Sequence, residues 1–187
     1  ASLSAAGIPM ISFASTSPAL SDAVSYPHFY RVVPSDAYQG DALADVISAA
    51  GLRNTAILSM TNAYGAGVGD AFAAAFEAKA DHQVCTRFTY ETGTSFTTAV
   101  VSDAIAAVQA GSSDGAACDS VLLASYSPDG AMLLGALRGE DSMIPAFGPD
   151  GMAGGAVVDA FTAAGITTAA LDGMVSTEPA GTGVSTG

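Results

Sequence analysis

Short apolar segments alternate with longer segments of helical periodicity along most of this chain, and this alternation constrains the fold more than any other feature. The apolar runs predict strands over 55–60, 83–90, 120–126, 144–147 and 172–177. The segments before and between them predict helices over 38–50, 65–80, 95–110, 129–138 and 155–164. Strands joined by single helices run parallel, with helices on both faces of the sheet. We therefore expect an α/β fold over 36–178, a doubly wound parallel five-stranded sheet.

The first 35 residues precede this regular winding. Apolar runs predict strands over 7–13 and 28–33. Between them, Ser17 is a suitable N-cap and Pro18 suits the first helical position, so we expect a short helix that ends near Tyr26. Residues 1–35 are thus interpreted as a separate strand–helix–strand piece.

The charge balance excludes several classes of partner. The chain has 18 Asp and Glu against 5 Lys and Arg, a formal net charge of −13. So few basic residues cannot neutralise a run of phosphates, and we expect no binding to nucleic acid or to an anionic membrane surface. Half of the residues are hydrophobic, which excludes intrinsic disorder despite the charge. No apolar stretch approaches the ~18 residues that a membrane-spanning helix needs.

Two motifs that resemble active-site sequences fail on their context. Segment 65–69 has the first glycines of a dinucleotide fingerprint, but the third glycine position holds Asp70. Segment 111–115 matches G-x-S-x-G, yet it follows a helix and precedes a strand, the reverse of a nucleophile elbow. We interpret the first as a tight turn and the second as a loop. The sequence thus predicts no catalytic residue, no cofactor and no enzymatic activity.

The cysteines and histidines give no metal-binding pattern. Cys85 and Cys118 form either one disulfide or two free thiols, and the sequence leaves this open. His28 and His82 stand in different predicted elements, far from either cysteine in the sequence. No zinc set can be assembled from these residues, so we expect no metal site.

Three polar side chains follow the carboxyl ends of predicted strands. Tyr64 follows strand 55–60, Tyr126 closes strand 120–126, and Asp150 follows strand 144–147. In an open parallel sheet, ligands bind outside the carboxyl ends of the strands. Two phenols and a carboxylate at this edge could form a cage around a cation. The alternative is that the tyrosines pack on helices and Asp150 caps the segment after it.

The turn after the first strand offers the opposite chemistry. Ala14, Ser15, Thr16 and Ser17 supply backbone N–H groups and hydroxyls that suit a carboxylate, although the same residues could form only a capping turn. A cation cage opposite an anion-binding turn is the pattern expected for a zwitterion such as a free amino acid. No Arg or Lys is placed to hold a second carboxylate, which disfavours an acidic ligand side chain.

These blocks of sequence also resemble a known family. The order of segments 7–12, 14–18 and 29–36, followed by 63–67, 90–93, 125–130 and 148–152, resembles the type I periplasmic solute-binding proteins. The similarity is to the leucine/isoleucine/valine-binding branch that serves ABC importers. It covers nearly the whole chain, with several blocks in the right order.

The resemblance implies a two-lobed receptor that closes on an amino acid by a hinge motion. Ala14 and Thr16 would hold the ligand carboxylate, Tyr64 and Tyr126 would face it, and Asp150 would take the ammonium. Many family members have Glu at the Asp150 position. Segment 35–36 would be a hinge crossing. The resemblance also implies an ABC permease as partner, a periplasmic location and a signal peptide on the full-length precursor.

Members of this family are roughly twice as long as this chain. We therefore expect a partial lobe one over 1–35, lobe two over 36–178, and a tail over 179–187 that approaches a second crossing between the lobes. Incomplete lobe-one strand edges would favour self-association. The alternative function is a sensory ligand-binding domain of a receptor or amide-type regulator with the same fold. An α/β enzyme working through carboxylates is a third hypothesis, and the sequence does not identify the ligand.

Overall fold

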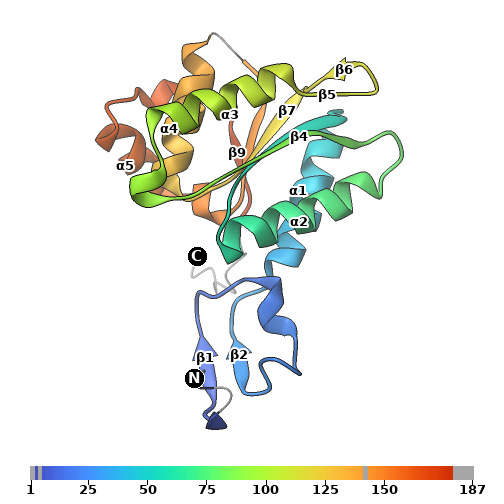
Figure 1. Cartoon of the computed structure of the whole chain (residues 1–187), viewed down its shortest axis with the longest axis vertical. Helices are drawn as coiled ribbons and strands as arrows, with labels where there is room; N and C mark the ends of the chain where they lie inside the picture. Colours follow the sequence, from blue (N-terminus) through green and yellow to red (C-terminus); the bar gives the residue numbers. More distant parts are fainter. Residues whose placement is uncertain (1–2, 4–5, 141–142, 179–187) are drawn as a thin grey trace, which may run out of the picture.

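The centre of the molecule is a five-stranded parallel sheet, seen in a computed structural model that describes residues 3, 6–140 and 143–178 (Figure 1). The strands are β3 (Asn54–Met60), β4 (Gln83–Tyr90), β7 (Ser120–Ala124), β8 (Ala146–Gly148) and β9 (Val175–Ser176). Their order in the sheet is β4-β3-β7-β8-β9, and every neighbouring pair is parallel. This confirms the predicted α/β fold and the number of strands in its main sheet.

Helices cover both faces of this sheet. Helices α1 (Asp36–Ala49) and α2 (Ala63–Glu77) pack on one face, and α3 (Thr98–Ala110), α4 (Ser127–Gly139) and α5 (Gly155–Ala163) pack on the other. Neighbouring residues of β3 alternate between the two cores: Ile57 belongs to the core under α1 and α2, and Leu58 to the core under the other three helices. This alternation follows from the period of two along a strand, and burial on both faces explains why segment 56–58 in the middle of β3 is apolar without interruption.

The N-terminal piece is a parallel strand pair, β1 (Met10–Ser12) with β2 (Phe29–Arg31), which lies apart from the main sheet (Figure 1). The prediction of a helix that extends to near Tyr26 between these strands is wrong. The structure has a short 3-10 turn there, η2 (Pro18–Ser21). Ser17 makes no side-chain cap, and no residue of the turn is buried. Without an apolar face to pack, the segment has little to stabilise further helical turns.

Segment 112–117 differs from the predicted loop. It forms a small antiparallel hairpin from β5 (Ser112–Ser113) and β6 (Ala116–Ala117). Asp114 and Gly115 at its tip both have positive φ, at 49° and 79°. This is the backbone that two-residue hairpin turns require, and Asp-Gly is a preferred pair there.

The cysteine question is settled by the structure. Cys85 and Cys118 form a disulfide, with their Cα atoms 5.6 Å apart. The bond joins β4 to the segment that leads from the hairpin into β7. These two positions lie toward the amino ends of the parallel strands, away from the carboxyl ends where ligands were expected.

The remaining short elements are the 3-10 turns η3 (Gly93–Ser95), η4 (Asp150–Met152) and η5 (Thr168–Leu171). The last strand, predicted over 172–177, is shortened to the two residues of β9. The predicted tail over 179–187 lies outside the described residues. Across the described ranges, no helix has both the length and the apolar character needed to span a membrane.

Candidate ligand-binding site

One pocket brings together the six residues singled out in the sequence. Its volume is about 500 Å³, and it lies between the turn after β1 and the carboxyl ends of β3, β7 and β8. Its lining includes Ala14, Ser15, Thr16, Tyr64, Tyr126 and Asp150. The expected convergence at one edge of the sheet is therefore present, while the binding role of these residues stays a prediction.

A hydrogen-bonded group connects Tyr64, Asp150 and Gly151. Tyr64 stands in the first turn of α2, where Asn62 caps the helix by accepting from Gly65 N. The Tyr64 hydroxyl donates to Asp150 Oδ1 at 2.5 Å and accepts from Gly151 N at 2.9 Å. Gly151 N also lies 2.9 Å from Asp150 Oδ1. These contacts hold one oxygen of the carboxylate in place and leave Oδ2 available to a ligand.

Gly151 is required by this close packing. A Cβ atom at this position would lie 2.6 Å from the Ser125 carbonyl oxygen and 2.8 Å from the Tyr64 hydroxyl. Its own carbonyl accepts from Ser127 Oγ at 2.7 Å, which ties the loop after β8 to the start of α4. Only a residue without a side chain lets the loop come this near to Tyr64.

The two tyrosines do not form the expected cage around a cation. Their rings stack on each other with centroids 4.9 Å apart and 10° between planes, which leaves no space for an ion between them. Tyr126, the N-cap residue of α4, remains 47% exposed and offers its outer face to the pocket. Burial raises the pKa of both phenols, and the bond to Asp150 raises that of Tyr64 further. Both therefore stay neutral.

The turn after β1 is less free than its sequence suggested. Ser12 Oγ accepts from Ala14 N at 3.2 Å and from Ser15 N at 2.9 Å, so these two N–H groups are not open to a ligand. Among the described residues, no acceptor faces the N–H groups of Thr16 and Ser17. The anion-binding capacity of the turn is therefore reduced to these two N–H groups, because the Thr16 hydroxyl bonds to the carboxyl group of Asp36.

Arg31 holds this turn in shape, a role that the sequence analysis missed. Its Nη1 donates to the carbonyl oxygens of Thr16 and Ser17, both at 2.9 Å, and its Nη2 donates to Ser21 Oγ. The guanidinium therefore binds the protein backbone rather than a ligand. No local signal marks this role, because it depends on the pairing of β1 with β2.

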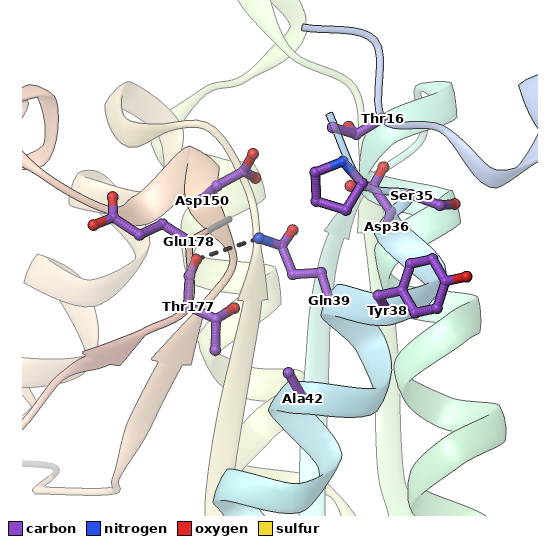
Figure 2. Close-up of a pocket in the computed structure, with 10 residues that line it drawn as sticks. Thr16, Ser35, Asp36, Tyr38, Gln39, Ala42, Asp150, Thr177 and Glu178 are labelled. Atoms are coloured by element: carbon purple, nitrogen blue, oxygen red, sulfur yellow. Dashed lines mark hydrogen bonds between the residues drawn. The ribbon is translucent and has the colours of Figure 1, made fainter. Parts of the chain in front are cut away.

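A second, smaller cavity of about 120 Å³ adjoins the pocket and shares Thr16 and Asp150 with it (Figure 2). It lies at the start of α1, where Asp36 is only 1% exposed. Burial, and secondarily the charge of Asp150, raise the pKa of Asp36 to about 6, against the lowering effects of a hydrogen bond with Thr16 and the charge of Arg31. Asp36 is thus a second candidate carboxylate that sequence reasoning assigned only to a hinge crossing.

The charges around these cavities have one sign. Asp36, Asp150 and Glu178 line them, and neither lining contains Lys, Arg or His. Carboxylates without basic partners favour a ligand with a cationic group. In the described ranges, no group of three or more His, Cys, Asp or Glu side chains is arranged to hold a metal ion.

Comparison with known proteins identifies the family. The sequence pattern of the receptor family ligand binding region matches residues 2–143. The chain belongs to this family. Its fold is that of the type I periplasmic binding proteins, as the resemblance implied. The receptor-family match covers the turn after β1, Asp36, Tyr64 and Tyr126, whereas Asp150 lies beyond it.

Two solved structures share the fold. A Rhodospirillum rubrum protein named for branched-chain amino acid ABC transport superposes with a TM-score of 0.66 at 21% identity, covering 92% of this chain and 45% of that chain. An ABC transporter substrate-binding protein from Desulfitobacterium hafniense gives a TM-score of 0.61 at 26% identity, covering 79% of this chain and 41% of that one. This chain therefore corresponds to less than half of either protein.

The curated proteins similar in sequence to this chain include metabotropic glutamate receptors. Receptor 6 of Oryctolagus cuniculus and receptor 8 of Homo sapiens are each 45% identical over 65 residues, which is 35% of this chain. The same stretch is 8% and 7% of those receptors. The chain thus spans a small part of the length of these relatives.

Proposed function

We propose that this chain is the ligand-binding part of a solute receptor for an ABC importer, and that it takes a branched-chain or other neutral amino acid without chemical conversion. The observation that supports this most is the placement of Tyr64, Asp150 and Gly151 opposite the turn after β1, around one pocket. One wall then offers carboxylates and the other offers backbone N–H groups. An amino acid carries the two complementary charges.

The ligand would bridge the two walls. Its ammonium would donate to Asp150 Oδ2 and to Asp36, the carboxylates that line the adjoining cavities. Its carboxylate would accept from the N–H groups of Thr16 and Ser17. The exposed face of Tyr126 would then contact the apolar side chain of the ligand. The linings contain no basic residue that could bind a second carboxylate, so neutral amino acids fit better than acidic ones.

The same proposal includes ABC permease subunits as partners, a periplasmic location and a signal peptide on the full-length precursor. Its support is the likeness to proteins named as parts of ABC transporters. Exposed apolar side chains on the strand pair of the N-terminal piece, such as Ile11 and Tyr30, support self-association of this chain.

Thermal-shift screening tests the function directly. The panel comprises L-leucine, L-isoleucine, L-valine, L-alanine and L-glutamate. A neutral amino acid at 100 times its Kd should stabilise the chain by about 2.7 kcal/mol. Asp150→Ala should remove this shift, whereas Asp172→Ala, an exposed aspartate outside both cavity linings, should keep it. The proposal is wrong if no neutral amino acid raises the melting temperature.

A sensory receptor domain is the second candidate function. It is favoured by the identity to metabotropic glutamate receptors over 65 residues. The gene that encodes the full-length protein separates the two candidates. A signalling or membrane-spanning region after the ligand-binding part would favour the sensor, and neighbouring permease genes would favour the importer.

A further inference from the structure

We propose that ligand binding at this site is coupled to the release of a proton from Asp36. The inference rests on the proposed function, because the arriving ammonium group of the ligand is what displaces the proton. It adds a regulation by pH that the family match and the structural likeness do not assign.

Asp36 has one oxygen atom without a donor. The side chain is 1% exposed, and Oδ2 is buried with no hydrogen-bond partner among the described residues. The hydroxyl of Thr16 bonds to the same carboxyl group. An ionised carboxylate buried with an unpaired oxygen is costly, and protonation is the usual way that this cost is avoided.

Gln39 on α1 also has a buried oxygen atom without a donor. Gln39 lies three positions after Asp36, so the two side chains emerge on the same side of the helix. Its Nε2 donates to the Thr177 carbonyl oxygen at 3.3 Å (Figure 2), which fixes the amide so that Oε1 is an acceptor. Oε1 is buried and has no partner in the described part of the chain. A proton on Asp36 would add a donor beside these two unpaired acceptors; the buried hydroxyl of Thr177, which lines the same cavity, is another potential donor without a partner among the described residues.

The charges that face Asp36 also favour the protonated form in the empty site. Asp150 and Glu178 line the same small cavity and repel an ionised Asp36. Arg31 attracts it, but the guanidinium is bonded to backbone carbonyls. The Tyr64 and Tyr126 phenols are neutral. The first-turn N–H groups of α1 are occupied as well: Asp36 N donates to Thr16 O, and Ala37 N to Ser35 Oγ.

An ammonium group reverses this balance. It donates hydrogens to the Asp36 carboxylate and offsets the negative charge of Asp150. The carboxylic acid O–H of Asp36 breaks, the proton passes to the buffer, and a carboxylate–ammonium pair forms. Because Asp36 in the free site still holds part of a proton near pH 6 and Asp36 in the occupied site does not, the affinity for the ligand should rise with pH and level off above about pH 7.

Calorimetry with L-leucine measures the proton directly. If leucine gives no thermal shift, the panel member with the largest shift replaces it. At pH 6, titrations in three buffers of different ionisation enthalpy should show release of about half a proton per ligand bound. Below pH 6 the affinity should fall by up to about tenfold per pH unit.

Two variants and a spectroscopic measurement complete the test. Asp36→Asn should abolish both proton release and the pH dependence of binding. Asp41→Asn, an exposed aspartate on the same helix, should leave both unchanged. In the ligand-free chain, the carboxyl ¹³C resonance that disappears in Asp36→Asn should titrate near pH 6. A titration near pH 4, or binding with no proton release at pH 6, would overturn the inference alone. Failure of every panel amino acid to bind would overturn the proposed function with it.

Discussion

The hydroxyl of Tyr64 lies 2.5 Å from Oδ1 of Asp150 and joins the first turn of α2 to the loop after β8. A hydrogen bond to an ionised group contributes about 1.5–3 kcal/mol. Tyr64→Phe should therefore lower the free energy of unfolding by about 1.5–3 kcal/mol and weaken amino-acid binding about tenfold. Chemical denaturation and calorimetry measure these two effects. Tyr30→Phe, at a 57% exposed position on β2, serves as the control and should change neither.

The space around Gly151 predicts a sharp response to a single methyl group. In Gly151→Ala the new Cβ would meet the Ser125 carbonyl at 2.6 Å, so the loop must move away from Tyr64. We expect a loss of about 1–3 kcal/mol in the free energy of unfolding, together with weaker binding. Gly155→Ala at the start of α5 is the matched control, because no atom lies within 4 Å of its Cβ. Equal stabilities for the two variants would show that the loop is not held as described.

The raised pKa of Asp36 has a consequence for stability that is separate from binding. Between the ordinary value of 3.8 and about 6, the folded chain holds more proton on Asp36 than the unfolded chain does. Its contribution to stability is therefore complete below pH 4 and is lost as the pH rises through 6. Asp36→Asn should be more stable than the unmodified chain at pH 7.5, by about 1–3 kcal/mol, and similar to it at pH 4. Urea unfolding at both pH values measures this, and a variant that is less stable at pH 7.5 would contradict it.

Arg31 should matter for binding although it does not line the pocket. Its fork of N–H groups holds the carbonyls of Thr16 and Ser17, and a lysine cannot reproduce that geometry. Arg31→Lys should weaken amino-acid binding several-fold. Arg87→Lys, which alters an exposed ion pair with Asp70, should leave the affinity unchanged. Calorimetry on both variants separates the effect of the turn from that of charge alone.

The disulfide should contribute to stability without affecting the site. A bond between Cys85 and Cys118 closes a loop with a sequence separation of 33, for which the chain-entropy model gives about 3–4 kcal/mol. A reducing agent should lower the urea midpoint of the chain accordingly. The Cys85→Ser, Cys118→Ser double variant is the control and should not respond to the reductant. An unchanged midpoint in the unmodified chain would show that the bond does not contribute in this way.

Much of the fold follows from local patterns that the sequence displays. The middle of β3 is apolar without interruption because Ile57 and Leu58 face different cores, and each following helix has its own apolar side. The carboxyl ends of the strands could also be located from the sequence. This predicted that Tyr64, Tyr126 and Asp150 lie at one edge of the sheet. These inferences depend only on strand and helix periods and on the parallel connection of strands.

The missed features depend on contacts between distant segments. Arg31 reaches Thr16 across 15 positions because β1 pairs with β2, and no local pattern reports that pairing. Asp36 looked like an ordinary first-turn carboxylate, and its burial results from the surrounding turn and the Asp150 loop. Stacking of the tyrosines is likewise set by the pairing of β3 with β7, which brings the first residues after these two strands side by side. The edge of the sheet at which these groups meet could be predicted from strand ends, whereas their mutual geometry depends on packing.

The β5–β6 hairpin precedes β7, so it stands at the end of the sheet opposite the pocket. Its tip, Asp114 and Gly115, has the backbone of a tight turn, and the neighbouring disulfide anchors its base to β4. A dye or an inserted reporter domain at this tip would be carried by a rigid support without touching the candidate ligand-binding pocket. The hairpin is therefore a natural attachment point for turning this receptor domain into an optical sensor.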